Sequence, residues 1–287
     1  MKTEQQPLDP RLDIPYQVLG CRVVVSTDVA EIAARVRDVA VAPQEDLEPA
    51  GEIAVEILRG DDGCFEIHAG GGVRDRSCEV DAVIAQLEAV ITRAAVERMG
   101  EWTRLHAGCV VVGGARILVS GDKGAGKTTT LLKLLLRGQE VLCDENVLLR
   151  GGDVLPVPRK FHLRDGTIAL MKEFAPVAAT LRKYHVQQLA PFHFFDPTDL
   201  GHGWRLSRGP VDAVLIIEPN RGGRSTITPL AKTDLVLRLL LQAPDLDDRA
   251  SRQIREISSF VAGARPLLLR LGDLDEAVDA LERLVAG

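Results

Sequence analysis

Residues 121–128 read Gly-Asp-Lys-Gly-Ala-Gly-Lys-Thr, the residue types and spacing of a Walker A phosphate loop. In such a loop the backbone N–H groups surround an anion, the lysine reaches the outer phosphates and the final hydroxyl ligates Mg²⁺. The candidate nucleotide-binding residues are Gly121, Asp122, Lys123, Gly124, Ala125, Gly126, Lys127, Thr128 and Thr129. The pattern predicts a site for a nucleoside triphosphate, with ATP as the default, together with Mg²⁺.

The segments on either side of the loop strengthen this prediction. Residues 115–120 are mostly apolar and predict a buried strand, whereas residues 128–137 predict a helix that ends at Gly138. A helix that begins at the loop directs its N-terminal N–H groups and its dipole at the phosphates. A strand, a glycine-rich loop and a helix in this order are more specific than the glycines alone.

Two adjacent carboxylates, Asp144 and Glu145, follow the apolar residues 141–143. This pattern resembles a Walker B element, whose acid holds Mg²⁺ directly or through water. Only 17 positions separate Lys127 from Asp144, so the loop helix leads directly into the strand that carries the acids. A carboxylate placed there can approach the terminal phosphate and take a proton from an incoming hydroxyl. The alternative is a solvated pair of acids at a strand end.

Several basic side chains are further candidates. Arg159, Lys160 and Arg164 follow the acid strand by one hairpin, and they either neutralise phosphate charge or form a solvated basic turn. Residues 221–224 read Arg-Gly-Gly-Arg, which suits an anion site or a plain hairpin turn. His106 precedes a strand of the nucleotide domain, although a lone histidine is more often a hydrogen-bonded core residue. Four of the other histidines have no evident partner and are expected to be structural or to lie at the surface: His162, His185, His193 and His202.

Charge and composition exclude several classes of protein. Residues 1–100 hold 10 basic and 19 acidic side chains, whereas residues 101–230, which include the phosphate loop, hold 17 basic and 12 acidic ones. A basic segment of this kind suits a triphosphate. The whole chain is acidic, with a net charge of −6 and 4% aromatic residues, which argues against nucleic acid as a partner. No run of about 18 uncharged apolar residues predicts a membrane span.

The five cysteines are scattered, odd in number and without a CxxC pair: Cys21, Cys64, Cys78, Cys109 and Cys143. This usage predicts free thiols in a reducing cytoplasm, and argues against a disulfide scaffold or a zinc site. Residues 1–7 are polar and lack the apolar core of a signal peptide. We therefore expect a cytoplasmic protein.

Three regions are expected along the chain: a flexible tail over residues 1–15, a small α+β domain over 16–100 and a domain with the phosphate loop over 101–287. For the α+β domain, the patterns predict strands at 18–25, 52–58, 64–68 and 76–80, and helices at 29–39 and 81–99, the second capped by Asp81. For the larger domain they predict strands at 107–112, 117–120, 140–143, 146–150 and 211–217. Its closing helices are expected to begin at Thr233, at Asp245 and Asp247, and at Asp273. Residues 172–208 read as a long irregular segment, which is a functional loop, a tether or an unrecognised helix.

Residues 105–108 (Leu-His-Ala-Gly), 117–128 and 137–147 together resemble the catalytic core of HPr kinase/phosphorylase. That core has a Leu-His-Gly step, a Gly-Asp-Ser-Gly-x-Gly-Lys-Ser loop, an Arg-Gly before the acid strand and an Asp-Asp pair. The close match covers about residues 104–150, and a looser one extends to about 245. The resemblance implies an α/β nucleotide domain of the phosphoenolpyruvate carboxykinase and HPr kinase type. It also implies an ATP-dependent kinase that acts on a serine-type hydroxyl.

By this resemblance Asp144 is the general base, Glu145 helps Thr128 and Asp144 to hold Mg²⁺, and His106 lies beside the transferred phosphoryl group. The chain departs from the family in having Lys123 where serine is usual, and Thr128-Thr129 where Ser-Glu is usual. It has no clear counterpart of the basic substrate loop, and its first 100 residues differ from the usual regulatory domain. In these respects it looks more like divergent relatives such as the lasso-peptide kinases.

Two functions from different classes follow. The first is a Mg²⁺- and ATP-dependent kinase that phosphorylates a hydroxyl on a peptide, protein or small molecule, with Lys127, Asp144, Glu145, His106 and Arg159 as its working residues. The second is an ATP-dependent switch or ATPase that binds a partner without modifying it. A carboxykinase-type reaction is weaker, because the metal-binding histidine and lysine motifs of that family are not found. The sequence leaves open the oligomeric state, a homo-oligomer included, and whether the first domain recognises substrate or forms a dimer surface.

Overall fold

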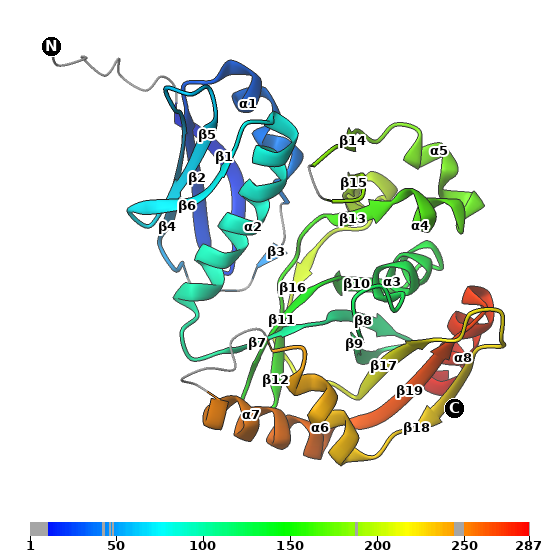
Figure 1. The fold of residues 1–287 in the computed structure, drawn as a ribbon. Coiled ribbons are helices and arrows are strands. Elements are labelled where there is room, and N and C mark those ends of the chain that lie inside the picture. The colour runs from blue at the N-terminus through cyan, green and yellow to red at the C-terminus, as the bar shows by residue number, and fades with distance from the viewer. Residues whose placement is uncertain are drawn as a thin grey trace, which may run out of the picture.

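The computed structural model describes residues 11–41, 44–45, 47, 49–186, 189–243 and 250–286. Residues 1–10 of the expected tail lie outside these ranges, as do Asp245 and Asp247 of an expected helix start. The described chain is a mixed α/β molecule in which an N-terminal sheet unit lies against a larger unit that carries the phosphate loop (Figure 1). Among the described residues, no helix combines the length and apolar character that a membrane crossing needs.

The N-terminal unit is a five-stranded sheet covered by helices on one side. Its strands, in spatial order, are β1 (Arg11–Val18), β2 (Cys21–Thr27), β4 (Glu52–Arg59), β5 (Phe65–Ala69) and β6 (Gly72–Ser77). β2 and β4 run parallel, and the other neighbours are antiparallel. Along β4 the residues alternate between exposed and buried, so one face packs on α1 (Ala30–Arg35), a short 3₁₀ turn (Val36–Asp38) and the long α2 (Val80–Arg98).

Three expectations for this unit are corrected. Residues 11–15 of the expected tail belong to β1, which pairs with β2. The strand expected at 76–80 lies at Gly72–Ser77. Asp81 does not cap α2, whose N-cap is Glu79 with no side-chain cap bond among the described residues. The Asp81 carboxylate instead accepts hydrogen bonds from Arg35 Nη2 at 2.6 Å and from the His185 backbone N–H at 3.0 Å, because a buried arginine offers it a stronger partner.

The cysteine prediction was wrong for one pair. Cys64 and Cys78 form a disulfide with their Cα atoms 4.0 Å apart. They flank the hairpin of β5 and β6, in which Phe65 pairs with Ser77, so the turn brings together two cysteines 14 positions apart. Cys21, Cys109 and Cys143 are buried and lie outside this disulfide. Because disulfides persist in oxidising surroundings, cysteine usage no longer argues for a reducing compartment.

The larger unit is built on a six-stranded mixed sheet. Its spatial order is β10 (Glu140–Cys143), β8 (Gly108–Val112), β9 (Ala115–Ser120), β17 (Ala213–Pro219), β19 (Arg265–Leu271) and β18 (Thr226–Pro229). β9, β17 and β19 are mutually parallel, and the other three are antiparallel to their neighbours. Helices α3 (Lys127–Leu136) and α8 (Leu274–Ala286) pack on one face, and α6 (Lys232–Leu240) and α7 (Ala250–Gly263) on the other.

The strand and helix on either side of the phosphate loop are confirmed, as is the start of α8, where the Glu276 backbone N–H donates to Asp273 Oδ1 at 2.9 Å. Strands β18 and β19 were not expected. Residues 265–271 contain three consecutive leucines between two arginines, and so short an apolar run cannot be told from a buried helix by its periodicity.

Two small sheets complete the surroundings of the site. One has the order β12 (Asp153–Pro156), β11 (Asn146–Arg150) and β7 (Thr103–His106). The other has the order β13 (Phe161–Arg164), β15 (Phe192–Phe195) and β14 (Lys183–Tyr184). The second sheet forms an aromatic lobe, here residues 161–206, with α4 (Asp165–Ala169), α5 (Ala175–Ala178), two 3₁₀ turns (Lys172–Phe174 and Pro197–Leu200) and β16 (Arg205–Leu206).

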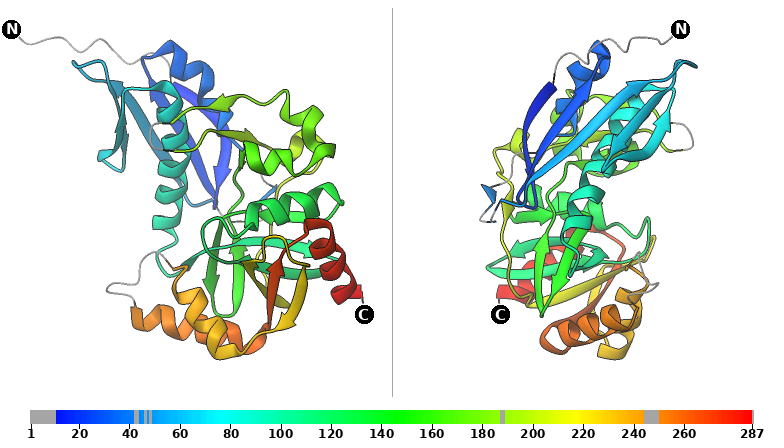
Figure 2. Two further views of the ribbon diagram at one scale, coloured as in Figure 1. Left: turned by 45° about the vertical axis from the view of Figure 1, so that its right-hand side comes forward. Right: turned by 90° about the vertical axis from the view of Figure 1, so that its left-hand side faces the viewer.

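The aromatic lobe includes most of the segment that was expected to be irregular, residues 172–208. It is ordered by packed rings, with Phe174 and Phe195 centroids 4.8 Å apart and Phe161 stacked near Trp204 at 6.2 Å. All three views place the lobe beside the N-terminal unit and above α3 (Figures 1 and 2). β16 pairs with β3 (Gln44–Glu45), and α2 contacts β14, so the two regions are joined at several points.

Candidate functional site

The loop between β9 and α3 has a backbone that depends on glycine. Gly126, the N-cap of α3, has a φ of 107°, and a Cβ there would lie 2.5 Å from Leu271 Cδ2. Gly121 has a φ of 148°, and a Cβ there would lie 2.6 Å from the Ile217 carbonyl oxygen of β17. Only glycine adopts these angles readily and tolerates this approach. The loop is therefore pressed against β17 and β19, and it places the N-terminus of α3 at the site.

Lys127 lies at the start of α3 and is buried, with 7% of its surface exposed. Its Nζ donates to the carbonyl oxygens of Gly121 at 2.6 Å and Asp122 at 3.2 Å. Burial lowers the pKa of Lys127, while the nearby carboxylates of Glu145, Asp122 and Asp144 oppose that shift. An ammonium group has three donors, so these contacts leave it able to engage a phosphate oxygen.

The remaining loop residues have different surroundings. Asp122, Lys123 and Gly124 are exposed, and Ala125 is buried. Thr128 is half-buried in the first turn of α3, and Thr129 Oγ1 lies 3.3 Å from Thr167 Oγ1 in α4. Thr128 therefore lies where a Walker A hydroxyl is expected, whereas Thr129 contacts the aromatic lobe.

The acid pair occupies the short connection between β10 and β11. Asp144 is 4% exposed, and its Oδ1 has no hydrogen-bond partner among the residues that the structure describes. Burial raises the pKa of Asp144 to about 8. The charge of Arg159 lowers this pKa, whereas the charges of Glu145 and Glu88 raise it. Burial acts the same way on Glu145, but there Arg159 and His106 outweigh it, so its pKa lies below the usual value. Neighbouring acids whose pKa values are pushed apart can take separate acid and base roles.

Gly108 sets how closely the strands approach the acid pair. A Cβ on Gly108 would lie 2.3 Å from Leu131 Cδ1, 3.0 Å from the Cys143 carbonyl oxygen and 3.1 Å from that of Asp144. The register of β8 and β10 also shifts between Val141 and Cys143, directly before the acids. Gly108 is the last residue of the Leu-His-Ala-Gly step. The close approach of Leu131 and the two carbonyl oxygens explains why this position is a glycine.

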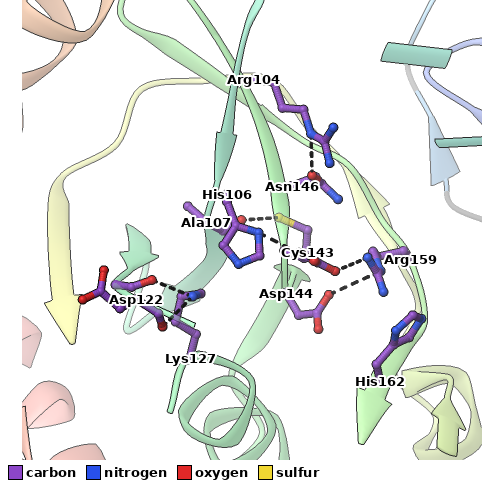
Figure 3. Close-up of polar contacts among 12 residues, drawn as sticks. Arg104, His106, Ala107, Asp122, Lys127, Cys143, Asp144, Asn146, Arg159 and His162 are labelled. Atoms are coloured by element: carbon purple, nitrogen blue, oxygen red, sulfur yellow. Dashed lines mark hydrogen bonds and ion pairs between the residues drawn. The ribbon is translucent and has the colours of Figure 1, made fainter. Parts of the chain in front are cut away.

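His106 ends β7 and lies between the loop lysine and the acid-bearing strand (Figure 3). Its Nδ1 is 3.6 Å from Glu145 Oε1. Burial lowers the pKa of His106, and the positive charges of Lys127, Arg104 and Arg159 lower it further against the effect of Glu145. The imidazole is thus biased to its neutral form at neutral pH.

Arg159 lies among three carboxylates and points toward Asp144 in Figure 3. Its Nη1 donates to Glu145 Oε2, and its Nε lies 3.0 Å from Glu88 Oε1 and 4.0 Å from Asp144 Oδ1. The other basic candidates have other neighbours. Lys160 Nζ is 4.0 Å from Asp196 Oδ2, and Arg164 is exposed.

The glycine-arginine turn at residues 221–224 is not part of this cluster. Arg224 Nε pairs with Glu276 Oε1 of α8 at 3.1 Å, and its carbonyl accepts from Asn220 Nδ2 at 2.9 Å. These residues form a turn, but the expected hairpin is wrong, because β19 lies between β17 and β18 in the sheet.

Two residues of the cluster were not recognised from the sequence. Glu88, in the middle of α2, is 1% exposed and contacts both Arg159 and His162. His162, expected to lack a partner, has its Nε2 3.5 Å from Glu88 Oε2 and its ring 4.8 Å from the ring of Phe192. One signal was present: Glu88 follows Ile84 by four positions and Leu87 by one, so it interrupts the apolar face of its helix.

The residues fit a nucleotide phosphate and Mg²⁺. Within the described ranges, no group of three or more His, Cys, Asp and Glu side chains is arranged as a metal site. Mg²⁺ is usually held by one or two carboxylates together with substrate phosphates and waters. Asp144, Glu145 and the Thr128 hydroxyl offer that set beside the glycine-rich loop, and the buried Oδ1 of Asp144 lacks a donor within the described chain.

Comparison with known proteins shows a relationship over part of the chain. No protein-family model matches it. Two curated HPr kinase/phosphorylases from Clostridium botulinum, strains Eklund 17B (Type B) and Alaska E43 (Type E3), are each 36% identical over 72 residues. The match covers 25% of this chain and 24% of each relative, so the chain spans about a quarter of the length of the relatives it matches.

A solved structure, the Hpr(Ser) kinase/phosphatase from Coxiella burnetii, aligns with 63% of this chain and 96% of its own, with a TM-score of 0.29 and 10% identity. The sequence matches to the clostridial proteins, rather than this structural likeness, carry the relationship. Those matches show that about a quarter of the chain is similar to HPr kinase/phosphorylases.

Proposed function

We propose that this protein is a Mg²⁺- and ATP-dependent kinase that transfers the terminal phosphoryl group to a hydroxyl on a peptide, protein or small molecule. The main support for this proposal is the state of one buried carboxylate. Asp144 is a buried carboxylate whose Oδ1 finds no hydrogen-bond donor in the described part of the chain, and burial raises its pKa to about 8. A general base works best when its pKa lies near the operating pH.

The phosphate-binding part of the site is the loop at residues 121–126 with the N-terminus of α3. Lys127 and the loop N–H groups would hold the phosphates, and the helix dipole would favour their negative charge. Thr128, Glu145 and Asp144 would hold Mg²⁺. When bound, the ion would supply positive charge that offsets the negative charge of the phosphates during transfer.

The transfer itself would use Asp144, Arg159 and His106. Asp144 Oδ1 accepts the proton of the acceptor hydroxyl, whose oxygen forms a bond to the terminal phosphorus while the bond from that phosphorus to ADP breaks. Arg159, beside both acids, and neutral His106 offer hydrogen-bond donors to the transferring group. Holding both reactants in line would lower the entropic part of the barrier.

The experiment that tests this function uses ATP labelled in its terminal phosphate, with Mg²⁺. The acceptors are serine peptides, a metabolite pool and HPr itself, because the names of the clostridial relatives give HPr as their substrate. Label on an acceptor, absent with Lys127→Ala, establishes the kinase. Release of free phosphate at a rate that no acceptor changes contradicts it and favours an ATP-driven switch.

A further inference from the structure

Glu88 belongs to the N-terminal unit, yet its carboxylate lies in the candidate site. It sits in the middle of α2 and is 1% exposed, with Oε1 3.0 Å from Arg159 Nε and Oε2 3.5 Å from His162 Nε2. A buried carboxylate is costly unless it is paired and hydrogen-bonded. Arg159, itself 7% exposed, provides that pairing from the chain that follows the acid pair.

The two edges of the Arg159 guanidinium are held by carboxylates from different units. The Nε edge faces Glu88 of α2, and Nη1 donates to Glu145 between β10 and β11. A guanidinium is planar and rigid, so two anchors on different edges define both its position and its plane. The N-terminal unit thus supplies one of the two anchors.

The same contact controls the distance between Arg159 and Asp144. Arg159 Nε is 3.0 Å from Glu88 but 4.0 Å from Asp144 Oδ1, so Glu88 draws the guanidinium away from that oxygen. Without the Glu88 charge, Glu145 and Asp144 still attract the guanidinium. It would then move onto Asp144 and occupy the oxygen that the proposed reaction needs.

Helix α2 is fixed firmly enough to present Glu88 in one place. At its first turn Asp81 accepts hydrogen bonds from Arg35 Nη2 and from the His185 N–H of the aromatic lobe. Next to this contact Tyr184 of β14 donates its hydroxyl to Asp38. A side chain held by packed, hydrogen-bonded surroundings can orient another residue accurately.

We propose that Glu88 is a positioning residue for Arg159, and that the N-terminal unit is thereby part of the phosphoryl-transfer site. The proposal rests on the proposed kinase function. Glu88 acts through Arg159, by holding the guanidinium beside Glu145 and off Asp144. This role differs from substrate recognition and from a dimer surface, the two roles that the sequence suggested for this unit.

The main test is Glu88→Gln in the full chain, which keeps the shape of the side chain and removes its charge. We expect the affinity for ATP to stay within about 3-fold and kcat to fall ~10–100-fold, the usual effect of losing a group that orients a residue in the site. Glu88→Asp, which restores the charge on a shorter stem, recovers part of the loss. Glu97→Gln is the matched control, because Glu97 lies on the same helix, is exposed and pairs with Arg74 at 3.5 Å.

A second readout needs no activity. The Nε–H of Arg159, assigned with Arg159→Lys, should exchange slowly with solvent in the native chain and faster in Glu88→Gln, as followed by ¹⁵N NMR. If exchange and kcat are both unchanged in Glu88→Gln, the positioning role is wrong. A Glu88→Gln chain that melts earlier but keeps its full kcat well below its melting temperature also overturns it. If neither the native chain nor any variant transfers phosphate, the proposed kinase function is wrong. In that case, equal Nε–H exchange in the native chain and in Glu88→Gln would separately reject the Glu88–Arg159 contact.

Discussion

The two adjacent acids differ because their neighbours differ. Asp144 is almost fully buried, and Arg159 approaches it only to 4.0 Å, so burial dominates and raises its pKa. Glu145 is about one-third exposed at its side chain and accepts directly from Arg159 Nη1, so its charge is stabilised. A pair that looks interchangeable in the sequence is thus divided into one acid whose pKa is raised by burial and one whose pKa is lowered by its positive neighbours.

Lys127 and Lys123 lie in the same loop but should differ sharply in nucleotide binding. Lys127→Ala removes a buried ammonium at the start of α3, and we expect the affinity for ATP to fall ~10–100-fold, the equivalent of a charge-assisted hydrogen bond. Lys123→Ala removes an exposed charge, and its affinity should change by less than about 3-fold. Titration with a fluorescent ATP analogue measures both. Equal losses in the two variants would show that the loop binds nucleotide by net charge rather than by the geometry of Lys127.

The elements around the site are held by contacts across long stretches of sequence. Asp81 at the start of α2 binds Arg35 of α1 and the backbone of His185 in the aromatic lobe, so one carboxylate joins three segments. Burial opposes the charge on Asp81, but the His185 N–H and Arg35 outweigh it, and its pKa lies below the usual value.

This carboxylate should make stability fall in acid. Because the pKa of Asp81 is lower in the folded chain than in the unfolded chain, its contribution is present above the unfolded value near pH 4 and is lost as pH falls through the folded value. Between about pH 5 and pH 3 the native chain should lose roughly 1 kcal/mol more unfolding free energy than Asp81→Asn. Urea unfolding at a series of pH values measures this. Asp61→Asn, at an exposed position, serves as control, and parallel curves for the native chain and Asp81→Asn would rule the contribution out.

Elements with a complete local signal could be predicted from the sequence. The loop from Gly121 to Thr128 predicts its strand and helix because glycine spacing, apolar runs and the Gly138 stop all lie within about 25 residues. β13 and β18 have four residues each, and the uninterrupted apolar run of β19 is three leucines long, so periodicity does not separate strand from helix in them. The disulfide and the Glu88–Arg159 contact depend on tertiary folding, so no local pattern reveals them.

One of the two buried apolar clusters of the described chain extends across both units. The same set of apolar contacts includes Ile57 of the N-terminal sheet, Leu87 of α2, Phe161 of the aromatic lobe and Leu215 of the central sheet. The expected division into domains at residue 100 describes the order of the chain, but the packing continues across it. The charged cluster of Glu88, Arg159 and His162 lies along this same boundary.

Continuous packing predicts one cooperative unfolding transition. Trp204, 1% exposed, lies in the aromatic lobe, whereas far-ultraviolet circular dichroism reports on all the helices and sheets. Melting curves from Trp204 fluorescence, with Trp102 replaced by Phe, and from circular dichroism should coincide, as required of a two-state transition. Two separate transitions would show that the N-terminal unit unfolds on its own, despite the shared cluster.

The most direct measurement compares Asp144→Asn with the native chain in the same samples. It measures the affinity for ATP and the rate at which label passes from ATP to the acceptor. Asparagine keeps the size of the side chain and cannot accept the hydroxyl proton. We predict an ATP affinity within about 3-fold of native and a transfer rate lowered ~10²–10⁴-fold, the usual contribution of a general base. Transfer by Asp144→Asn at the native rate would contradict Asp144 as the base.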